Sequence, residues 1–282
     1  MFEDLWPCLV AIARWRGPGT PSLPAGSVRH DAAAGWQLGD GPWDDAAREQ
    51  WALFKPLLDA RAEGPPWVIA QLGQSLDGCI ATRCGDSAFV SGPEVLCHLH
   101  RLRALCDAVI VGAGTVAIDN PRLTTRHAAG PNPLRVLFDP RLGLAGCVAS
   151  AHVFTDTDVP TLWLCDARWQ ARAAALAGAA RVLAVPGLLR DDGTPDAAAA
   201  LAALQARGCR RVLVEGGGVT VSRFLAQRRL DRLHLSIAPV LIGDGRRGLS
   251  FAGSERLADC ARPRCRVFNV GSDRLWDVDL RS

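Results

Sequence analysis

Short apolar runs, each bounded by glycine, proline or polar residues, recur along the chain and predict buried strands. The clearest are Trp67–Gly73, Ala108–Val111 and Leu134–Phe138. Segments between such runs carry apolar residues at helical spacing, as from Ser91 to about Cys106. Strands that alternate with helices are typical of a mostly parallel sheet flanked by helices, which makes the fold class α/β. The same reasoning predicts further strands at His152–Thr155, Thr161–Leu164, Arg181–Val185 and Leu233–Pro239, and alanine-rich helices at 167–177 and 196–207.

The end of the chain has a different pattern. Apolar residues alternate with polar ones in Arg266–Val270 and again in Arg274–Leu280, and Gly271-Ser272 separates the two runs. This spacing is typical of an antiparallel hairpin. The sheet is therefore predicted to be mixed, with a C-terminal antiparallel hairpin added to parallel strands.

Residues 1–66 differ from the rest, because they hold five of the nine tryptophans and eight of the eighteen prolines. Pro65-Pro66 marks the boundary with a main domain at 67–282. Asp44 is a candidate N-cap for a helix through about Lys55, and Pro56 is a candidate start for a second short helix that ends near Gly64. A segment so rich in tryptophan is too apolar for a disordered tail. We expect this N-terminal extension to be partly helical and to pack on the main domain or on a partner subunit.

Composition excludes several classes of protein. The 282 residues are 49% hydrophobic and carry a net charge of +3 without a basic run, so we expect no nucleic-acid partner. We also expect no membrane span, since no apolar run approaches the ~20 residues that one needs. Acidic residues in the first ten positions do not fit an export signal. The ten cysteines lack CxxC or zinc spacing, which favours reduced thiols, no bound metal and a cytoplasmic protein.

The stretch Arg211–Ala226 has the strongest local signal for a binding site. An apolar run at 212–214 predicts a strand, Glu215 follows it, and Gly216–Gly218 lead into an amphipathic helix. A strand, a glycine turn and a helix present free backbone N–H groups to an anion, and glycines allow it to come close. The alternative is a tight turn without a ligand. Three glycines in a row favour a cofactor phosphate.

A second glycine pattern, Gly112-x-Gly114-x-x-Ala117, matches the dinucleotide-binding fingerprint, with Asp139 at the end of the next strand. However, Asp119-Asn120-Pro121 breaks the following helix within seven residues, so a strand-end turn is the better interpretation. Hydroxyl groups and two arginines that can hold a phosphate occur in the same part of the chain, although each taken singly is more typical of a surface or cap residue. The hydroxyl groups are those of Ser87 and Thr115 and the arginines are Arg103 and Arg126; Asp119 lies in the same stretch.

Five motifs occur in order along the span 67–282: SLDG (75–78), GDS (85–87), GAGTV-x-x-DNPRLTTR (112–126), VEGGG (214–218) and LSIAPVLIGDGRRG (235–248). Taken together, they resemble the reductase half of the bacterial riboflavin-biosynthesis deaminase–reductase, a family with a dihydrofolate-reductase-like fold. Their order and spacing match, which makes the set specific.

The resemblance implies an NADPH-dependent reduction of a ribosylamino-pyrimidine 5′-phosphate to its ribitylamino product, by hydride addition to an imine carbon. It also implies a homodimer. The implied cofactor residues are Gly73, Thr115, Asp119, Gly217, Gly218, Val219 and Thr220, within a contact segment that runs to Arg223. The implied substrate residues are Ser87, Arg103, Leu123, Arg126 and Glu215. Of these, Arg103 and Arg126 would bind the 5′-phosphate. Asp119 or Glu215 would be the polar group nearest the reacting atoms.

Three positions depart from the family's usual residues: Gln71 replaces Lys, Phe89 replaces Trp and Pro140 replaces Ser. Gln supplies no charge and Pro no N–H. One alternative is therefore a reductase of another pterin or pyrimidine in a secondary pathway, and another is a catalytically silent NADPH-binding protein. The zinc motifs H-x-E and P-C-x-x-C of the companion deaminase do not occur, so we expect a stand-alone reductase with an unrelated extension.

Overall fold

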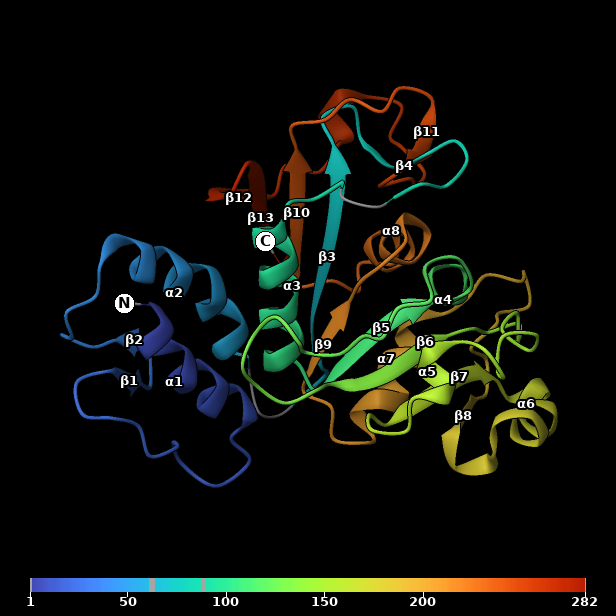
Figure 1. Cartoon of the computed structure of the whole chain (residues 1–282), viewed down its shortest axis with the longest axis horizontal. Coiled ribbons are helices and arrows are strands. Elements are labelled where there is room, and N and C mark those ends of the chain that lie inside the picture. Colours follow the sequence, from blue (N-terminus) through green and yellow to red (C-terminus); the bar gives the residue numbers. More distant parts are fainter. Residues whose placement is uncertain (1, 61–63, 88–89, 282) are drawn as a thin grey trace.

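The computed structural model describes residues 2–60, 64–87 and 90–281, and a nine-stranded sheet crosses its centre (Figure 1). From β10 to β8 every neighbouring pair of strands is parallel, whereas β13 is antiparallel to β10 and β12 to β13. The mostly parallel sheet and the C-terminal hairpin are thus confirmed. In spatial order the strands are β12 (Arg264–Val270), β13 (Asp273–Asp279), β10 (Arg232–Ala238), β3 (Trp67–Ser75), β9 (Arg211–Val214), β5 (Ala108–Gly112), β6 (Leu134–Phe138), β7 (Thr161–Asp166) and β8 (Val182–Val185).

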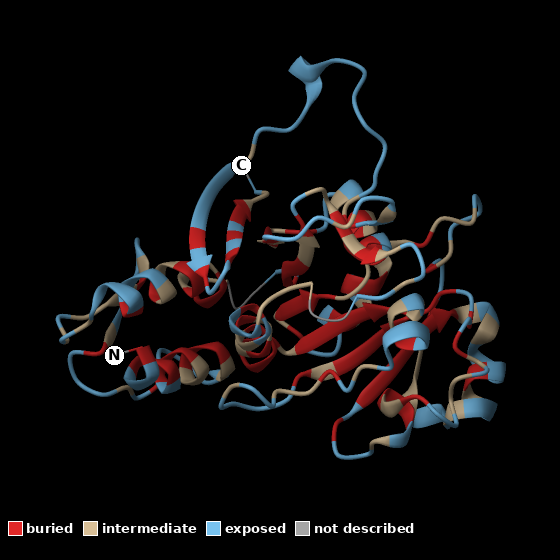
Figure 2. Ribbon diagram, turned by 45° about the horizontal axis from the view of Figure 1, so that its top comes forward, coloured by how far each residue is buried: buried red, intermediate tan, exposed pale blue. Residues whose placement is uncertain are grey.

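Helices cover both faces of this sheet, so its central strands are buried throughout (Figure 2). Successive residues of β3 show the two faces: Ile69 belongs to one core, and Val68 and Ala70 belong to the other. The first core is closed by α1 (Phe2–Arg14), α2 (Asp45–Leu58), α3 (Pro93–Leu105), α5 (His152–Thr155) and α6 (Gln170–Ala177). The second is closed by α7 (Ala197–Gln205) and α8 (Gly218–Ala226).

Several smaller elements complete the fold. None of the described helices has the length and apolar character that a membrane crossing needs. The short helix α4 (Ala113–Asp119) follows β5, and an antiparallel ribbon of β4 (Cys79–Thr82) and β11 (Gly245–Arg247) lies beside the main sheet. The others are the hairpin β1 (Val28–Asp31) and β2 (Gly35–Leu38) and the 3₁₀ turns Ala167–Trp169, Ala179–Arg181 and Leu257–Asp259.

The N-terminal extension packs on the main domain, as expected. Trp6, Trp51 and Phe54 are buried in the same core as the residues of α3. The Phe54 ring stacks on the His98 ring of α3, with 5.4 Å between the ring centroids. Figure 1 shows α1 and α2 side by side next to α3. The extension therefore buries one side of the helix that carries Arg103.

Arg211 joins this extension to the sheet. Its guanidinium is buried at the start of β9 and donates to the carbonyl of Ala13, at 2.7 Å, and to that of Leu57, at 2.9 Å. It also donates to the Leu58 carbonyl. These carbonyls lie at the C-terminal ends of α1 and α2, where unpaired acceptors and the helix dipole favour a cation. One side chain of the main domain thus caps two helices of the extension.

Local predictions at helix starts had mixed outcomes. Asp44 caps α2, because its carboxylate accepts a hydrogen bond from the Ala47 N–H at 2.8 Å. Ser91-x-x-Glu94 has the spacing of a capping box, and the prediction of such a cap is wrong: α3 begins at Pro93 after Gly92, without a side-chain cap. Proline suits the first helical position, where its missing N–H costs nothing. The Ser91 hydroxyl lies against Gly73 instead.

Two other predictions are wrong for packing reasons. Pro56 does not start a new helix but lies inside α2, which continues to Leu58. Burial of Leu57 and Leu58 holds this last turn in place, and Arg211 binds its carbonyls. The predicted strand at 152–155 is the single helical turn α5, because an apolar run of this length does not distinguish the two structures. Helix α1 was not predicted at all.

Candidate active site

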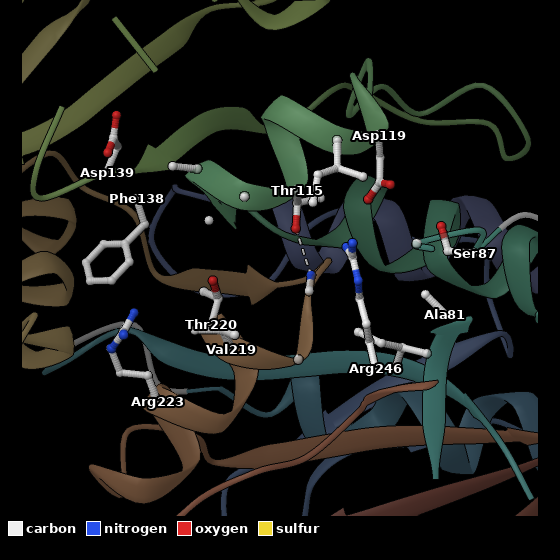
Figure 3. A pocket seen from close by; sticks show the side chains of 18 of the residues that line it. Ala81, Ser87, Thr115, Asp119, Phe138, Asp139, Val219, Thr220, Arg223 and Arg246 are labelled. Carbon is white, nitrogen blue, oxygen red and sulfur yellow. Dashed lines mark hydrogen bonds between the residues drawn. The ribbon is translucent and has the colours of Figure 1, made fainter. Parts of the chain in front are cut away.

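Two adjoining cavities open at the C-terminal ends of the parallel strands, the edge where sheets of this kind bind ligands. The first cavity, of about 610 Å³, lies between α4, α8 and β11 (Figure 3). The second, of about 430 Å³, lies between β3, α3 and the turn after β9. The two cavities form one continuous cleft, because they share the residues Ile80, Ser87, Asp119 and Gly217.

The glycine turn after β9 is part of the wall of both cavities. The Gly217 N–H donates to the Thr115 hydroxyl at 2.8 Å, the dashed line in Figure 3. Gly216 has φ +90°, and a Cβ there would lie 2.9 Å from the Thr115 side chain. A Cβ on Gly218 would lie 1.9 Å from the Gly248 carbonyl oxygen. Backbone conformation and packing thus require two of the three glycines, which corrects the view that all three exist to admit a phosphate.

The first cavity nevertheless fits a phosphorylated cofactor. The N-terminus of α8 faces it with the backbone of Gly218 and Val219, and the Thr220 hydroxyl lies close by. A Cβ on Gly114 would meet nothing within 4 Å, so this wall leaves open space for a ligand. In Figure 3, Thr115 and Thr220 flank the opening, and Arg223 points toward Phe138 at the far end. Hydroxyls, helix N–H groups and guanidinium groups are the usual ligands of phosphates.

Asp119 lies where the two cavities meet. It is the last residue of α4, which ends because Asn120 adopts a left-handed conformation with φ +41°, so the helix after the glycines is short as predicted. Partial removal from water raises the pKa of the Asp119 carboxyl, while Arg246 and a hydrogen bond with Ser87 act in the opposite direction. A carboxyl whose pKa is raised holds its proton more readily and can donate it to a ligand in the cleft.

Glu215 forms part of the wall of the second cavity and is held by a buried ion pair. The Arg103 guanidinium donates from Nε to one carboxylate oxygen at 2.9 Å and from Nη2 to the other at 2.6 Å. Both side chains are almost fully buried, with about 5% of each exposed. Arg103 Nη1 donates to the Thr124 carbonyl at 2.9 Å. Arg103 therefore fixes Glu215 and the nearby loop.

That loop holds Leu123 in an unfavourable conformation. Leu123 is buried at φ +56°, a region that a bulky side chain seldom adopts. The carbonyls on either side of it are both held by buried arginines: Arg103 binds that of Thr124, and Arg135 binds that of Arg122. Such strain persists only where surrounding contacts fix the backbone. Arg103 and Arg135 therefore hold the backbone of this loop on both sides of Leu123.

Residues 66–270 match the model of the RibD C-terminal domain. The chain belongs to this family. It is 33% identical over 222 residues to the 2,5-diamino-6-ribosylamino-4(3H)-pyrimidinone 5′-phosphate reductase of Methanothermobacter thermautotrophicus, a match that covers 77% of this chain and 99% of that protein. It is 34% identical over 203 residues to the riboflavin biosynthesis protein RibD of Chlamydia trachomatis, covering 70% of this chain and 52% of that protein.

A solved structure agrees with these likenesses. It is the Thermotoga maritima diaminohydroxyphosphoribosylaminopyrimidine deaminase/5-amino-6-(5-phosphoribosylamino)uracil reductase, with a TM-score of 0.62 and 26% identity. The match covers 83% of this chain and 62% of that chain. The chain thus spans about half to two thirds of the length of the RibD relatives. The family resemblance and the dihydrofolate-reductase-like fold are both confirmed.

Most residues that the family resemblance implies lie in the cleft. Thr115 and residues 217–220 line the first cavity, Gly73 and Glu215 line the second, and Ser87 and Asp119 line both. Neither cavity is lined by Arg103, Leu123 or Arg126. Arg103 is connected to the second cavity through its hydrogen bonds to Glu215. The Arg126 side chain is exposed, and its backbone N–H donates to Nδ1 of His100. Burial and the nearby Arg103 and Arg126 lower the pKa of His100 to about 3, so this acceptor is neutral.

Two of the three departures from the family pattern line the cleft. Gln71 is buried in β3 and lines the second cavity, whereas Pro140 lines the first. Phe89 lies outside the described residues. Within the described parts of the chain, no group of three metal-binding side chains comes together.

Three arginines that line the first cavity, Arg141, Arg246 and Arg247, were not predicted as site residues, and Arg223 appeared only as the end of a predicted contact segment. Burial, together with the positive charge of Arg141, lowers the pKa of Arg223, and no described carboxylate pairs with Arg223. For Arg246 the signal was its place in the glycine-bounded motif at 243–248. For Arg141 only the structure reveals its place in the cavity, because its neighbours Gly193 and Arg223 are distant in the chain.

Proposed function

We propose that this protein is an NADPH-dependent reductase that converts a phosphoribosylamino-pyrimidine to its ribitylamino product in riboflavin biosynthesis. Membership of the RibD C-terminal domain family and the names of the relatives support this. One structural observation carries the proposal: the two cavities meet at Asp119, with Glu215 on the wall of the second. A cofactor in the first cavity and a substrate in the second would therefore come together beside a carboxyl whose pKa is raised.

The first cavity is the proposed cofactor site. The glycine turn and the first turn of α8 would hold the cofactor's phosphates, and Thr115 keeps this turn in place. Arg141 and Arg223 repel one another, and no carboxylate of the described residues pairs with either of them. The apolar side chain of Phe138 lines the same cavity. Two like charges near one another favour the binding of a phosphate between them. NADPH carries an additional phosphate on its adenosine that NADH lacks, so this pair supports NADPH over NADH. When bound, the nicotinamide would supply a hydride.

The second cavity is the proposed substrate site. Reduction of the imine form of the substrate needs a hydride at carbon and a proton at nitrogen. We assign the proton to Asp119, because its pKa is raised and because it lies at the border of the two cavities. Closure of the cleft by both ligands would exclude more water and raise that pKa further. Glu215, kept in place by Arg103, would accept hydrogen bonds from the substrate and orient it.

The direct test is turnover. Purified protein is mixed with NADPH and either 5-amino-6-(5-phosphoribosylamino)uracil or its 2,5-diaminopyrimidinone counterpart, and both cofactor oxidation and ribitylamino product are measured. We expect turnover with at least one of the two, and the ratio of kcat/KM values identifies the preferred substrate. Absence of product at saturating concentrations of both compounds would refute the proposed reaction.

Gln71 favours a second candidate. Its amide lines the substrate cavity where the family usually has a charged lysine, and an amide can both donate and accept hydrogen bonds. A reductase of another pyrimidine or a pterin fits this change, and a panel of such compounds distinguishes it from the leading proposal. A catalytically silent protein would instead be stabilised against heat by NADPH and reduce none of them.

We further propose a cytoplasmic homodimer. All ten cysteines are free thiols, which fits a reducing compartment. Val267 and Trp276 are partners in the β12–β13 register and remain exposed, which gives this sheet edge an apolar surface. Light scattering of the purified protein measures the mass directly. A Trp276→Glu variant is expected to be monomeric if this edge forms the contact.

A further inference from the structure

Arg246 is directed into the first cavity by a feature of the β4–β11 ribbon. It pairs with Ala81 of β4, and the register shifts between Arg246 and Arg247. Such a bulge turns adjacent side chains in different directions. In Figure 3 the Arg246 side chain extends across the cavity toward Thr115 and Asp119. Arg247 also lines this cavity, but its guanidinium donates to the Asp77 carbonyl at 2.8 Å.

Among the described residues, the Arg246 guanidinium has no hydrogen-bond or ion-pair partner, although it lies close enough to Asp119 to affect the titration of that carboxyl. The chain leaves room for it at Gly85, where a Cβ would lie 2.8 Å from Nη2 of Arg246. Gly85 also has φ +96°. A guanidinium without a partner in a cavity is available to bind an anion.

The loop that carries Arg246 is fixed against the first turn of α8. The Gly248 carbonyl touches Gly218, the first residue of that helix. The Ser250 N–H donates to the Ser222 hydroxyl at 2.8 Å, and the Gly248 N–H donates to the Gly78 carbonyl at 2.9 Å. Because these contacts hold the loop at both sides, the arginine stays at the mouth of the first cavity, opposite the glycine turn.

We propose that Arg246 binds the diphosphate of the dinucleotide cofactor from the side opposite the glycine turn. This role rests on the proposed function, because it presupposes that the first cavity takes a dinucleotide. A guanidinium presents paired donors to phosphate oxygens and supplies the positive charge that the backbone of the turn lacks. Under this assignment the arginines of the cavity bind different phosphates of the cofactor. Arg246 binds the diphosphate, and Arg141 and Arg223 bind the phosphate on the adenosine.

The test compares ligands with and without a diphosphate. Dissociation constants of NADPH and of 2′-AMP are measured by calorimetry for the native protein, Arg246→Gln and Arg83→Gln. Arg83 is the control, because it is an exposed arginine directly after β4 that does not line the cavity. We expect Arg246→Gln to weaken NADPH binding about tenfold to a hundredfold, with 2′-AMP binding unchanged. Arg83→Gln should bind both like the native protein, and Arg246→Lys should recover part of the lost affinity.

The outcomes separate this inference from the function on which it rests. Native affinity of Arg246→Gln for NADPH would overturn the role of Arg246 and leave the reductase proposal intact. A higher KM for the pyrimidine with unchanged NADPH affinity would likewise overturn it, since the arginine would then bind substrate. Failure of the native protein to bind NADPH would overturn both. Thermal unfolding of the unliganded variants checks that the substitutions preserve the fold.

Discussion

Replacement of Arg103 by methionine would leave Glu215 as a buried carboxylate without its cation. The native pair is joined by two hydrogen bonds of 2.9 and 2.6 Å, and about 5% of each side chain is exposed. Removal of one partner of such a pair costs about 3–5 kcal/mol, because the remaining charge has lost its compensation and water cannot replace it. For a chain of this length we expect the unfolding midpoint to fall by about 5–15 °C.

A double-mutant cycle measures this coupling. Urea unfolding is followed by circular dichroism for Arg103→Met, Glu215→Leu and the double variant, and NADPH oxidation is followed in parallel. The double variant should lose less stability than the sum of the two single variants by about 2–3 kcal/mol, since it buries no unpaired charge. Additive losses would refute the reasoning, because they would mean that the two side chains do not depend on one another. All three variants should lose activity, as each removes or releases Glu215.

Three further predictions follow from the site and the extension. Asp119→Asn should lower kcat about a hundredfold or more. In the native protein, kcat should fall at alkaline pH because Asp119 loses its proton as pH rises through its raised pKa, and this alkaline limb should be absent in the variant. In Arg246→Gln the same limb should move to higher pH, because loss of a nearby cation favours the protonated carboxyl. Arg211→Met should lower the free energy of unfolding in urea by about 2 kcal/mol and leave kcat unchanged. The loss is moderate because burial of the cation, which lowers the pKa of Arg211 to about 10, has a free-energy cost that the variant avoids.

The sequence predicted the centre of the sheet well, because buried parallel strands are continuous apolar runs. Leu134–Phe138 has the same bounds in the sequence prediction and in the structure. It predicted less well where a short segment depends on distant contacts. The turn at 152–155 and the continuation of α2 past Pro56 are set by what packs on them.

The same limit applies to the candidate site. Motifs placed Asp119 and the glycine turn in the cleft, because each is local in the chain. No pattern predicted that Arg103 pairs with Glu215, since the two residues lie 112 positions apart. The sequence could not predict either that Arg223 and Arg246 have no carboxylate partner among the described residues. Such pairing depends on which carboxylates lie close in space and not in sequence.

The double cap formed by Arg211 has a consequence for the order of folding. Ala13 and Arg211, which it joins, are separated by 198 positions. Helices α1 and α2 are made first, but their C-terminal carbonyls receive their cation only after β9 has been synthesised and has joined the sheet. Contacts across such a separation form slowly, because a long loop must close before they stabilise anything. During synthesis the carbonyls at the ends of α1 and α2 therefore stay without this cation until β9, in the second half of the chain, has been made.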